Sequence, residues 1–225
     1  MTWVLLHFSR LGAARYVSHL DTARALQRTF ARAGVQLALS QGMRPKPRLS
    51  LGLPLPVGVA GLHELAAAEL EPGQMYDPAA MLAKLRTAAP EGVVPLAVEV
   101  SEQRLRLEPV SADYQCSLPL DAAEAAVAAA DYSQAAAVLV ERVSPKGRRS
   151  VDLKRSVGTV SVQPAKDGAL LCFTVRQRTD GAARPDEVVR EVARRAGRPD
   201  VVAEVTRLHV VYNGLPEGAY GRESE

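Results

Sequence analysis

Residues 158–178, "GTVSVQPAKDGALLCFTVRQR", form the clearest pair of strands in the sequence. Two apolar, β-branched runs flank "KDG" at 166–168, where glycine allows the backbone angles of a tight turn. A helix is predicted next over 184–197, with Pro185 near its start and Gly197 at its end, followed by a strand over 202–213. This arrangement predicts an antiparallel sheet packed against helices, which is an α+β fold.

The residues before this hairpin complete the pattern. A strand is predicted over 113–120 and a helix over 121–131, with Asp121 as its N-cap. Residues 136–143 fit either a strand or the end of that helix, and 144–157 fit either a hairpin or a loop that leads into a helix. The order is that of a βαββαβ unit.

The first half of the chain has the same predicted order. Its elements are strands over 3–10, 48–55, 63–71 and 93–105 and helices over 18–33 and 77–90. Two successive βαββαβ units predict tandem ferredoxin-like half-domains with antiparallel sheets. The predicted domains are 1–108 and 109–213, followed by a tail over 214–225.

Arginines line one face of the helix predicted over 18–33. Arg24, Arg28 and Arg32 are four residues apart, so they share a face, and the helix carries a single acid, Asp21. Like charges at this spacing destabilise a helix unless an anion lies opposite. That anion is either RNA phosphate or the chain's own glutamates at 64, 69 and 71.

A second basic segment follows at 40–48, "SQGMRPKPR". Arg44, Lys46 and Arg48 alternate with two prolines, which favour an extended backbone and so direct the basic side chains to one side. Such a row suits a phosphate backbone; the alternative is a rigid connector that protects a sheet edge.

The third basic segment, 144–158, contains Lys146 and further cations in a glycine-containing stretch, and it fits either a nucleic-acid contact or a solvated loop. The candidate RNA-binding residues are Arg15, Arg24, Arg28, Arg32, Arg44, Lys46, Arg48, Arg148, Arg149, Lys154 and Arg155.

Charge is distributed unevenly along the chain, although the total is only +3. Residues 1–60 carry +7, residues 61–143 carry −8 and residues 144–225 carry +4. A strongly basic segment favours a polyanionic partner, because bound cations release counterions from phosphates. The alternative is that the basic and acidic segments neutralise each other within the molecule.

Few residues suggest catalysis. His19, at the start of the helix over 18–33, lies at the positive end of the helix dipole, which favours neutral imidazole and so a general base, with Tyr16 or Lys46 in support; a capping or core-edge histidine is the alternative. The sequence has no catalytic or phosphate-binding signature and two distant cysteines, so we expect no metal and no cofactor. No apolar run could span a bilayer, and we expect a soluble cytoplasmic protein without a membrane partner.

Three motifs, "Y-x-SHLD" (16–21), "S-x-G-x-x-P-x-P" (40–47) and "LPVG" (55–58), resemble the radical-SAM-associated domain of unknown function found in bacteria. "VDLKRSV" (151–157) and "RPDEVV" (184–189) extend the resemblance to about residue 212. The family occurs free-standing or C-terminal to cobalamin-binding radical SAM proteins. Its usual motif, "SxGFNPHP", has an aromatic and a histidine where this chain has Met43 and Lys46, so a catalytic role for that histidine would be lost here.

The resemblance implies an RNA context, since the family is sometimes encoded near ribonucleases of the E/G type and ribosomal proteins. The chain itself lacks the three cysteines of a radical SAM cluster. We therefore expect an RNA-binding module in tRNA or rRNA maturation, with a radical SAM enzyme or a ribonuclease as a protein partner. A metal-independent RNA-cleaving or RNA-modifying enzyme and a protein–protein adaptor are the alternatives.

Overall fold

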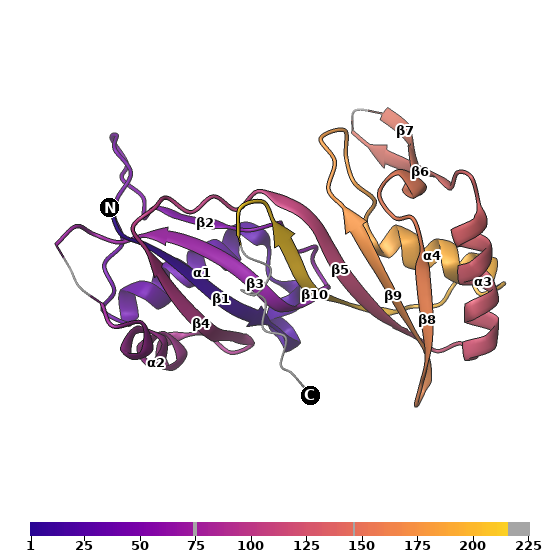
Figure 1. The fold of residues 1–225 in the computed structure, drawn as a ribbon, viewed down its shortest axis with the longest axis horizontal. Helices are drawn as coiled ribbons and strands as arrows, with labels where there is room; N and C mark the ends of the chain where they lie inside the picture. Colours follow the sequence, from indigo (N-terminus) through magenta and orange to yellow (C-terminus); the bar gives the residue numbers. More distant parts are fainter. Residues whose placement is uncertain (74–75, 146, 216–225) are drawn as a thin grey trace. The chain divides into compact units, whose positions relative to one another are not determined.

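The computed structural model describes residues 1–73, 76–145 and 147–215. The chain divides into two compact units: unit 1 comprises Met1–Pro109 with residues 212–215, and unit 2 comprises Val110–Val211. The predicted α+β class is confirmed (Figure 1). The helices of the described residues are α1 His19–Arg32, α2 Pro78–Ala88, α3 Ala122–Gln134 and α4 Pro185–Arg195.

Unit 1 contains a sheet with the strand order β4-β1-β3-β2. Its strands are β1 Trp3–Arg10, β2 Leu49–Leu51, β3 Ala60–Glu69 and β4 Val93–Ser101. All three neighbouring pairs are antiparallel. A short 3-10 helix, η1 Gly12–Tyr16, lies between β1 and α1. Between β1 and β2 the chain is therefore helical or irregular.

The core of unit 1 lies between its sheet and its two helices. Alternate residues of β1, Val4, Leu6 and Phe8, are buried on the helical side, as the two-residue period of a strand requires. They pack in one cluster with Phe30 of α1 and Leu85 of α2, both fully buried. Each such side chain stabilises the fold by about 1.5–3 kcal/mol.

A buried arginine ties the irregular part of unit 1 to this core. Arg10, at the end of β1, is 2% exposed. Its guanidinium donates hydrogen bonds to the Thr22 hydroxyl (2.9 Å) and to the carbonyls of Val17 (3.1 Å) and Leu55 (3.4 Å). Arg10 therefore fixes the start of α1 against the "LPVG" segment, a role that was not predicted from the sequence.

Unit 2 has the strand order β10-β5-β9-β8 and a separate two-stranded hairpin, β6-β7. Its strands are β5 Pro109–Leu118, β6 Leu139–Ser144, β7 Gly147–Asp152, β8 Val160–Ala165, β9 Gly168–Arg176 and β10 Glu204–Tyr212. Of the alternatives for residues 136–157, the structure has a hairpin followed by a 3-10 turn, η2 Leu153–Arg155.

Local signals in unit 2 act as the sequence predicts. The Asp121 carboxylate accepts hydrogen bonds from the amides of Ala123 (2.8 Å) and Glu124 (3.2 Å) and so caps α3. Gly168 opens β9 with a φ of 138°, and a Cβ there would lie 2.2 Å from the Leu118 carbonyl oxygen. Only glycine fits this turn.

None of the helices in the described part of the chain is both long and apolar enough to cross a membrane.

Candidate nucleic-acid interface

Helix α1 exposes the predicted arginine stripe. The helix begins after Ser18, whose hydroxyl accepts a hydrogen bond from the Asp21 amide at 3.1 Å. It buries Leu26 and Phe30 completely. The arginines of the stripe are all exposed: Arg24, Arg28 and Arg32. The amphipathic pattern thus leaves a basic face to solvent.

The three arginines differ in what lies opposite them. Arg24 pairs with Asp21 at 2.9 Å, and Arg32 donates to the Ala88 carbonyl at the end of α2 (3.2 Å). Arg28 forms no ion pair with any carboxylate of the described residues. The pKa of Asp21 is lowered, first by the hydrogen bond from the Ser18 hydroxyl and then by Arg24, so its charge persists at neutral pH and partly neutralises the stripe.

Residues 39–48, which we call the basic hairpin, form a narrow two-armed loop. Its arms are joined by the Leu39–Pro47 bridge and by two hydrogen bonds: the Ser40 amide donates to the Lys46 carbonyl (2.8 Å) and the Lys46 amide to the Ser40 hydroxyl (3.0 Å). Gly42 turns the chain at a φ of 125°. Figure 1 shows this hairpin extending beyond the ends of the neighbouring strands of unit 1.

The basic hairpin adds exposed cations to those of α1. Arg44 and Lys46 in the basic hairpin are exposed, and like Arg28 they form no ion pair with a carboxylate of the described residues. Helix and hairpin are in contact, because the Gln27 side-chain amide donates to the Pro47 carbonyl at 3.5 Å. We call Arg28, Arg44 and Lys46 the basic ridge.

Arg48 does not belong to the basic ridge. Its guanidinium lies 2.7 Å from a carboxylate oxygen of Glu69, which is buried in β3. A groove of about 760 Å³ runs beside this pair and is lined by α1, by both arms of the hairpin and by Glu71. Internal neutralisation, one of the two alternatives for the basic segments, therefore holds for Arg48 and not for the ridge.

The three candidate catalytic residues occupy different surroundings. His19 lines a cavity of about 10 Å³ beside Arg10, too small for a nucleotide. Tyr16 is exposed, and its hydroxyl accepts a hydrogen bond from Arg15 at 2.9 Å. Lys46 directly precedes Pro47, whose carbonyl accepts a hydrogen bond from Gln27 of α1. Gln27 is eight residues from His19, which is about 12 Å along the helix axis.

The cysteines offer no nucleophile either. Burial raises the pKa of the Cys116 thiol to about 12 and also raises the pKa of Cys172. Neither is a thiolate near neutral pH. Within the described residues, no group of histidine, cysteine, aspartate or glutamate side chains has the arrangement of a metal site.

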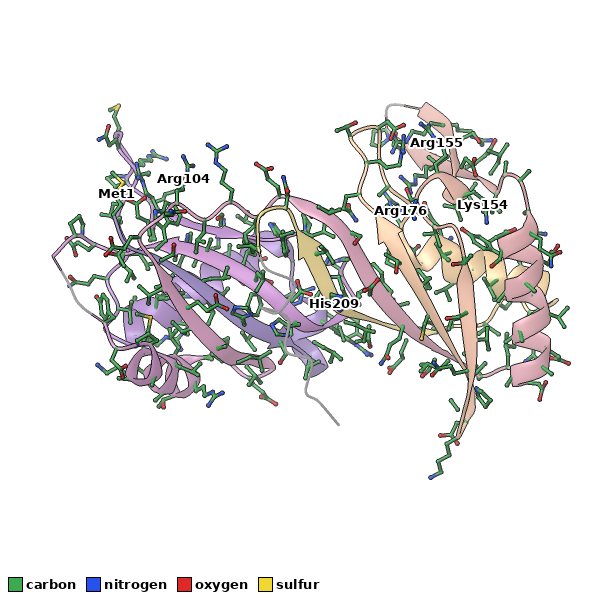
Figure 2. All side chains as sticks on the ribbon, viewed as in Figure 1. Met1, Arg104, Lys154, Arg155, Arg176 and His209 are labelled. Atoms are coloured by element: carbon green, nitrogen blue, oxygen red, sulfur yellow. The ribbon has the colours of Figure 1, made fainter. Side chains whose placement is uncertain are left out.

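Two of the basic residues predicted around 144–158, Lys154 and Arg155, form contacts within unit 2 (Figure 2). The Lys154 ammonium donates to the carbonyls of Ser133 (2.8 Å) and Gly158 and lies over the Tyr132 ring. Arg155 pairs with Asp180 at 2.9 Å. These contacts hold η2 in place rather than leaving its cations to a ligand.

The tip of the β6-β7 hairpin is more open. Arg148 lies 4.0 Å from Glu141, and both side chains are exposed; Arg149 is also exposed. Lys146, predicted in the same segment, lies outside the described residues.

One buried ion pair of unit 2 was not predicted. Arg142 of β6 lies 2.6 Å from each carboxylate oxygen of Glu187 in α4, and it also donates to the Ala182 carbonyl (2.8 Å). Both side chains are less than a tenth exposed. Such bidentate geometry anchors the β6-β7 hairpin to α4.

A polar cavity of about 490 Å³ lies on unit 2 among β5, β8 and β9. Asp113 in its lining pairs with His209 at 2.9 Å and accepts a hydrogen bond from the Thr174 hydroxyl. The hydrogen bond from His209 is the main reason why the pKa of Asp113 is lowered. Arg176, beside this group, is exposed (Figure 2). One oxygen of the Asp113 carboxylate is paired with His209 and the other accepts from Thr174, so Asp113 is not arranged as a general base.

Unit 1 has a histidine pair, the buried His7 and the half-buried His63. His7 is 1% exposed; its Nε2 lies 2.9 Å from a Glu99 oxygen and its Nδ1 lies 2.8 Å from His63 Nε2. Burial lowers the pKa of His7, and the Glu99 carboxylate partly opposes that shift. His7 is therefore a neutral, structural residue at pH 7.

The chain is thus an α+β protein with exposed cations on α1 and the basic hairpin, and with others elsewhere, such as Lys84, Arg106 and Lys166. It belongs to the DUF2344 family, described as an uncharacterized protein conserved in bacteria, which matches residues 4–185. No curated protein matches the chain. Among solved structures, a protein described as a candidate glycine cleavage system transcriptional repressor is similar at 8% identity and a TM-score of 0.22, over 94% of this chain and 98% of that one.

Proposed function

We propose that the protein is an RNA-binding module that contacts phosphates through the basic ridge. The observation that carries the proposal is that Arg28, Arg44 and Lys46 are exposed, lie on two elements in contact, and form no ion pair with any described carboxylate. Cations in this state gain most from a polyanion, because binding releases its counterions and no internal pair has to be broken.

Wider features of the chain support an RNA partner in particular. Residues 1–60 carry +7, and the sequence motifs resemble a radical-SAM-associated family with an RNA context. The strand orders β4-β1-β3-β2 and β10-β5-β9-β8 support a tandem ferredoxin-like arrangement. We place this module in tRNA or rRNA maturation, with a radical SAM enzyme or a ribonuclease as its protein partner.

The proposed role is binding without catalysis. His19 sits beside a cavity too small for a nucleotide. The contact of Gln27 with Pro47, the neighbour of Lys46, is about two helical turns from His19 along α1. The adaptor alternative has less support, because two acids of the −8 segment are paired within the chain, Glu69 with Arg48 and Asp131 with Arg195.

The test is RNA binding measured across a salt titration, with bulk bacterial tRNA as the probe. The triple variant Arg28→Ala, Arg44→Ala, Lys46→Ala removes the ridge. Losing three phosphate contacts is expected to weaken binding and to reduce the slope of log K against log salt by about 2 for single-stranded sites.

A matched control removes the same charge elsewhere. Arg106, Lys166 and Arg198 are exposed and lie outside the ridge, so their triple alanine variant is expected to keep the wild-type slope. If both triple variants lose tRNA affinity equally, net charge alone explains the loss. If the wild type does not bind tRNA at low salt, the proposal is wrong. Binding of a protein partner in a pull-down without RNA affinity would then favour the adaptor.

A further inference from the structure

The most exposed large apolar side chain in the described part of the chain is Met43, at 103% of its reference area. It stands at the tip of the basic hairpin, directly before Arg44 and three residues before Lys46. A fully exposed methionine gains nothing from the fold of its own chain. Its surroundings therefore have to indicate what it contacts.

The hairpin holds this tip in a defined position. The Ser40 and Lys46 main chains are joined on the inner side, and the Arg48 amide donates to the Ala38 carbonyl at 2.8 Å. Pro45 and Pro47 restrict the returning arm. A preorganised loop loses less conformational entropy on binding than a free one does, so an exposed apolar tip on it is suited to insertion.

We infer that Met43 packs against an unpaired RNA base while Arg44 and Lys46 hold the adjoining phosphates. The inference rests on the proposed function and adds its substrate class, which is RNA with a single-stranded loop, bulge or end. Apolar wedges that include methionine insert between bases in nucleic-acid complexes, and the polarisable thioether makes favourable contacts with aromatic rings.

Charge around the tip favours a nucleic acid over an apolar protein groove. Both ionised side chains of the tip, Arg44 and Lys46, are cations, and neither is neutralised by a described carboxylate. Desolvating two unpaired cations in an apolar groove is costly, whereas phosphates would pair with them. An unpaired base is the target that fits best, because the unstacked bases of RNA loops, bulges and ends are the ones that protein side chains stack on.

The test compares two RNA probes of the same composition: a hairpin with 2-aminopurine in its loop, and a fully paired duplex. The variant Met43→Ala is expected to weaken loop binding about five- to tenfold, at the low end of the effect of removing a stacking side chain. The salt slope is expected to stay that of the wild type, because no charge is removed. Met43→Leu is expected to weaken loop binding less than Met43→Ala does. The change in 2-aminopurine fluorescence on binding is expected to be largest for the wild type.

Val127→Ala is the control, because Val127 is exposed on α3, far along the sequence from the ridge. Equal affinity of Met43→Ala and wild type for the loop probe, or equal weakening on the duplex, overturns the inference while leaving the proposed function intact. A wild type that binds neither probe at low salt overturns both, and binding that needs DNA instead of RNA does the same.

Discussion

Basic residues of the two units differ in what lies opposite them. In α4 of unit 2, arginines and acids alternate at helical spacing, so Arg190 pairs with Asp186, and Arg194 and Arg195 both pair with Glu191. In contrast, α1 of unit 1 has three arginines and a single acid, Asp21, which pairs with Arg24. In these two helices, the presence of an acid within one helical turn of an arginine, rather than the net charge, therefore decides whether that arginine is paired.

The buried pair of unit 2 gives the largest expected effect. Arg142→Ala leaves the Glu187 carboxylate buried without its partner, which is expected to lower the free energy of unfolding by about 3 kcal/mol. Urea unfolding of both proteins measures the difference. The double variant Arg142→Ala, Glu187→Ala is expected to lose less than the sum of the two single variants, since each alone leaves a buried charge.

Arg148→Ala is the matched control, because its partner Glu141 lies 4.0 Å away at the surface. Its expected cost is below about 0.5 kcal/mol. A similarly small cost for Arg142→Ala would break the comparison, because the cations of unit 2 would then be no more structural than those of the ridge.

Sequence reasoning predicted the features that depend on neighbours along the chain. Asp121 acts as an N-cap, Pro185 starts α4, and the turn at Gly168 joins β8 to β9. Each of these signals acts within a few residues, so a single sequence contains it.

Contacts between distant segments were beyond the sequence. Arg48 looked like its neighbours Arg44 and Lys46, yet it pairs with Glu69, which is 21 residues away. Arg10 and Arg142 are buried although arginine is mostly a surface residue. For Arg48 and Arg142, the register of β2 against β3 and the docking of the β6-β7 hairpin on α4 decide which carboxylate each cation meets.

Mildly acidic pH is expected to destabilise unit 1 before unit 2, and this effect is smaller than that of Arg142→Ala. Burial lowers the pKa of His7 in unit 1, so the unfolded chain binds a proton more readily than the folded one. Stability from His7 is complete above its ordinary pKa of about 6.5 and is lost as the pH falls below it, by at most about 1.4 kcal/mol per pH unit. Fluorescence of Trp3, the single tryptophan and a β1 residue, reports unfolding of unit 1.

Unit 2 is expected to respond only at lower pH. The pKa of Asp113 is lowered by His209, and that of Glu191 is lowered first by its hydrogen bond from Arg194. Their contribution is present above the ordinary carboxyl pKa and is lost as the pH falls through the acid range. Amide hydrogen exchange in α4 follows unit 2, and the variant His7→Gln is expected to remove the earlier loss in unit 1. An identical pH profile in His7→Gln would show that another group titrates.

The smallest expected effect concerns Arg24, the one stripe arginine whose partner is a surface acid. Asp21→Asn keeps an acceptor for the Ser18 hydroxyl and frees Arg24, so tRNA affinity at low salt is expected to rise about twofold, with a slope steeper by about 0.7. The matched control is Asp186→Asn, which frees Arg190 in α4 of unit 2 in the same way. A rise in Asp21→Asn alone assigns RNA contact to α1, because both variants change the net charge equally. An equal rise in both would mean that any freed arginine suffices, and the distinction between the ridge and the remaining basic surface would fail.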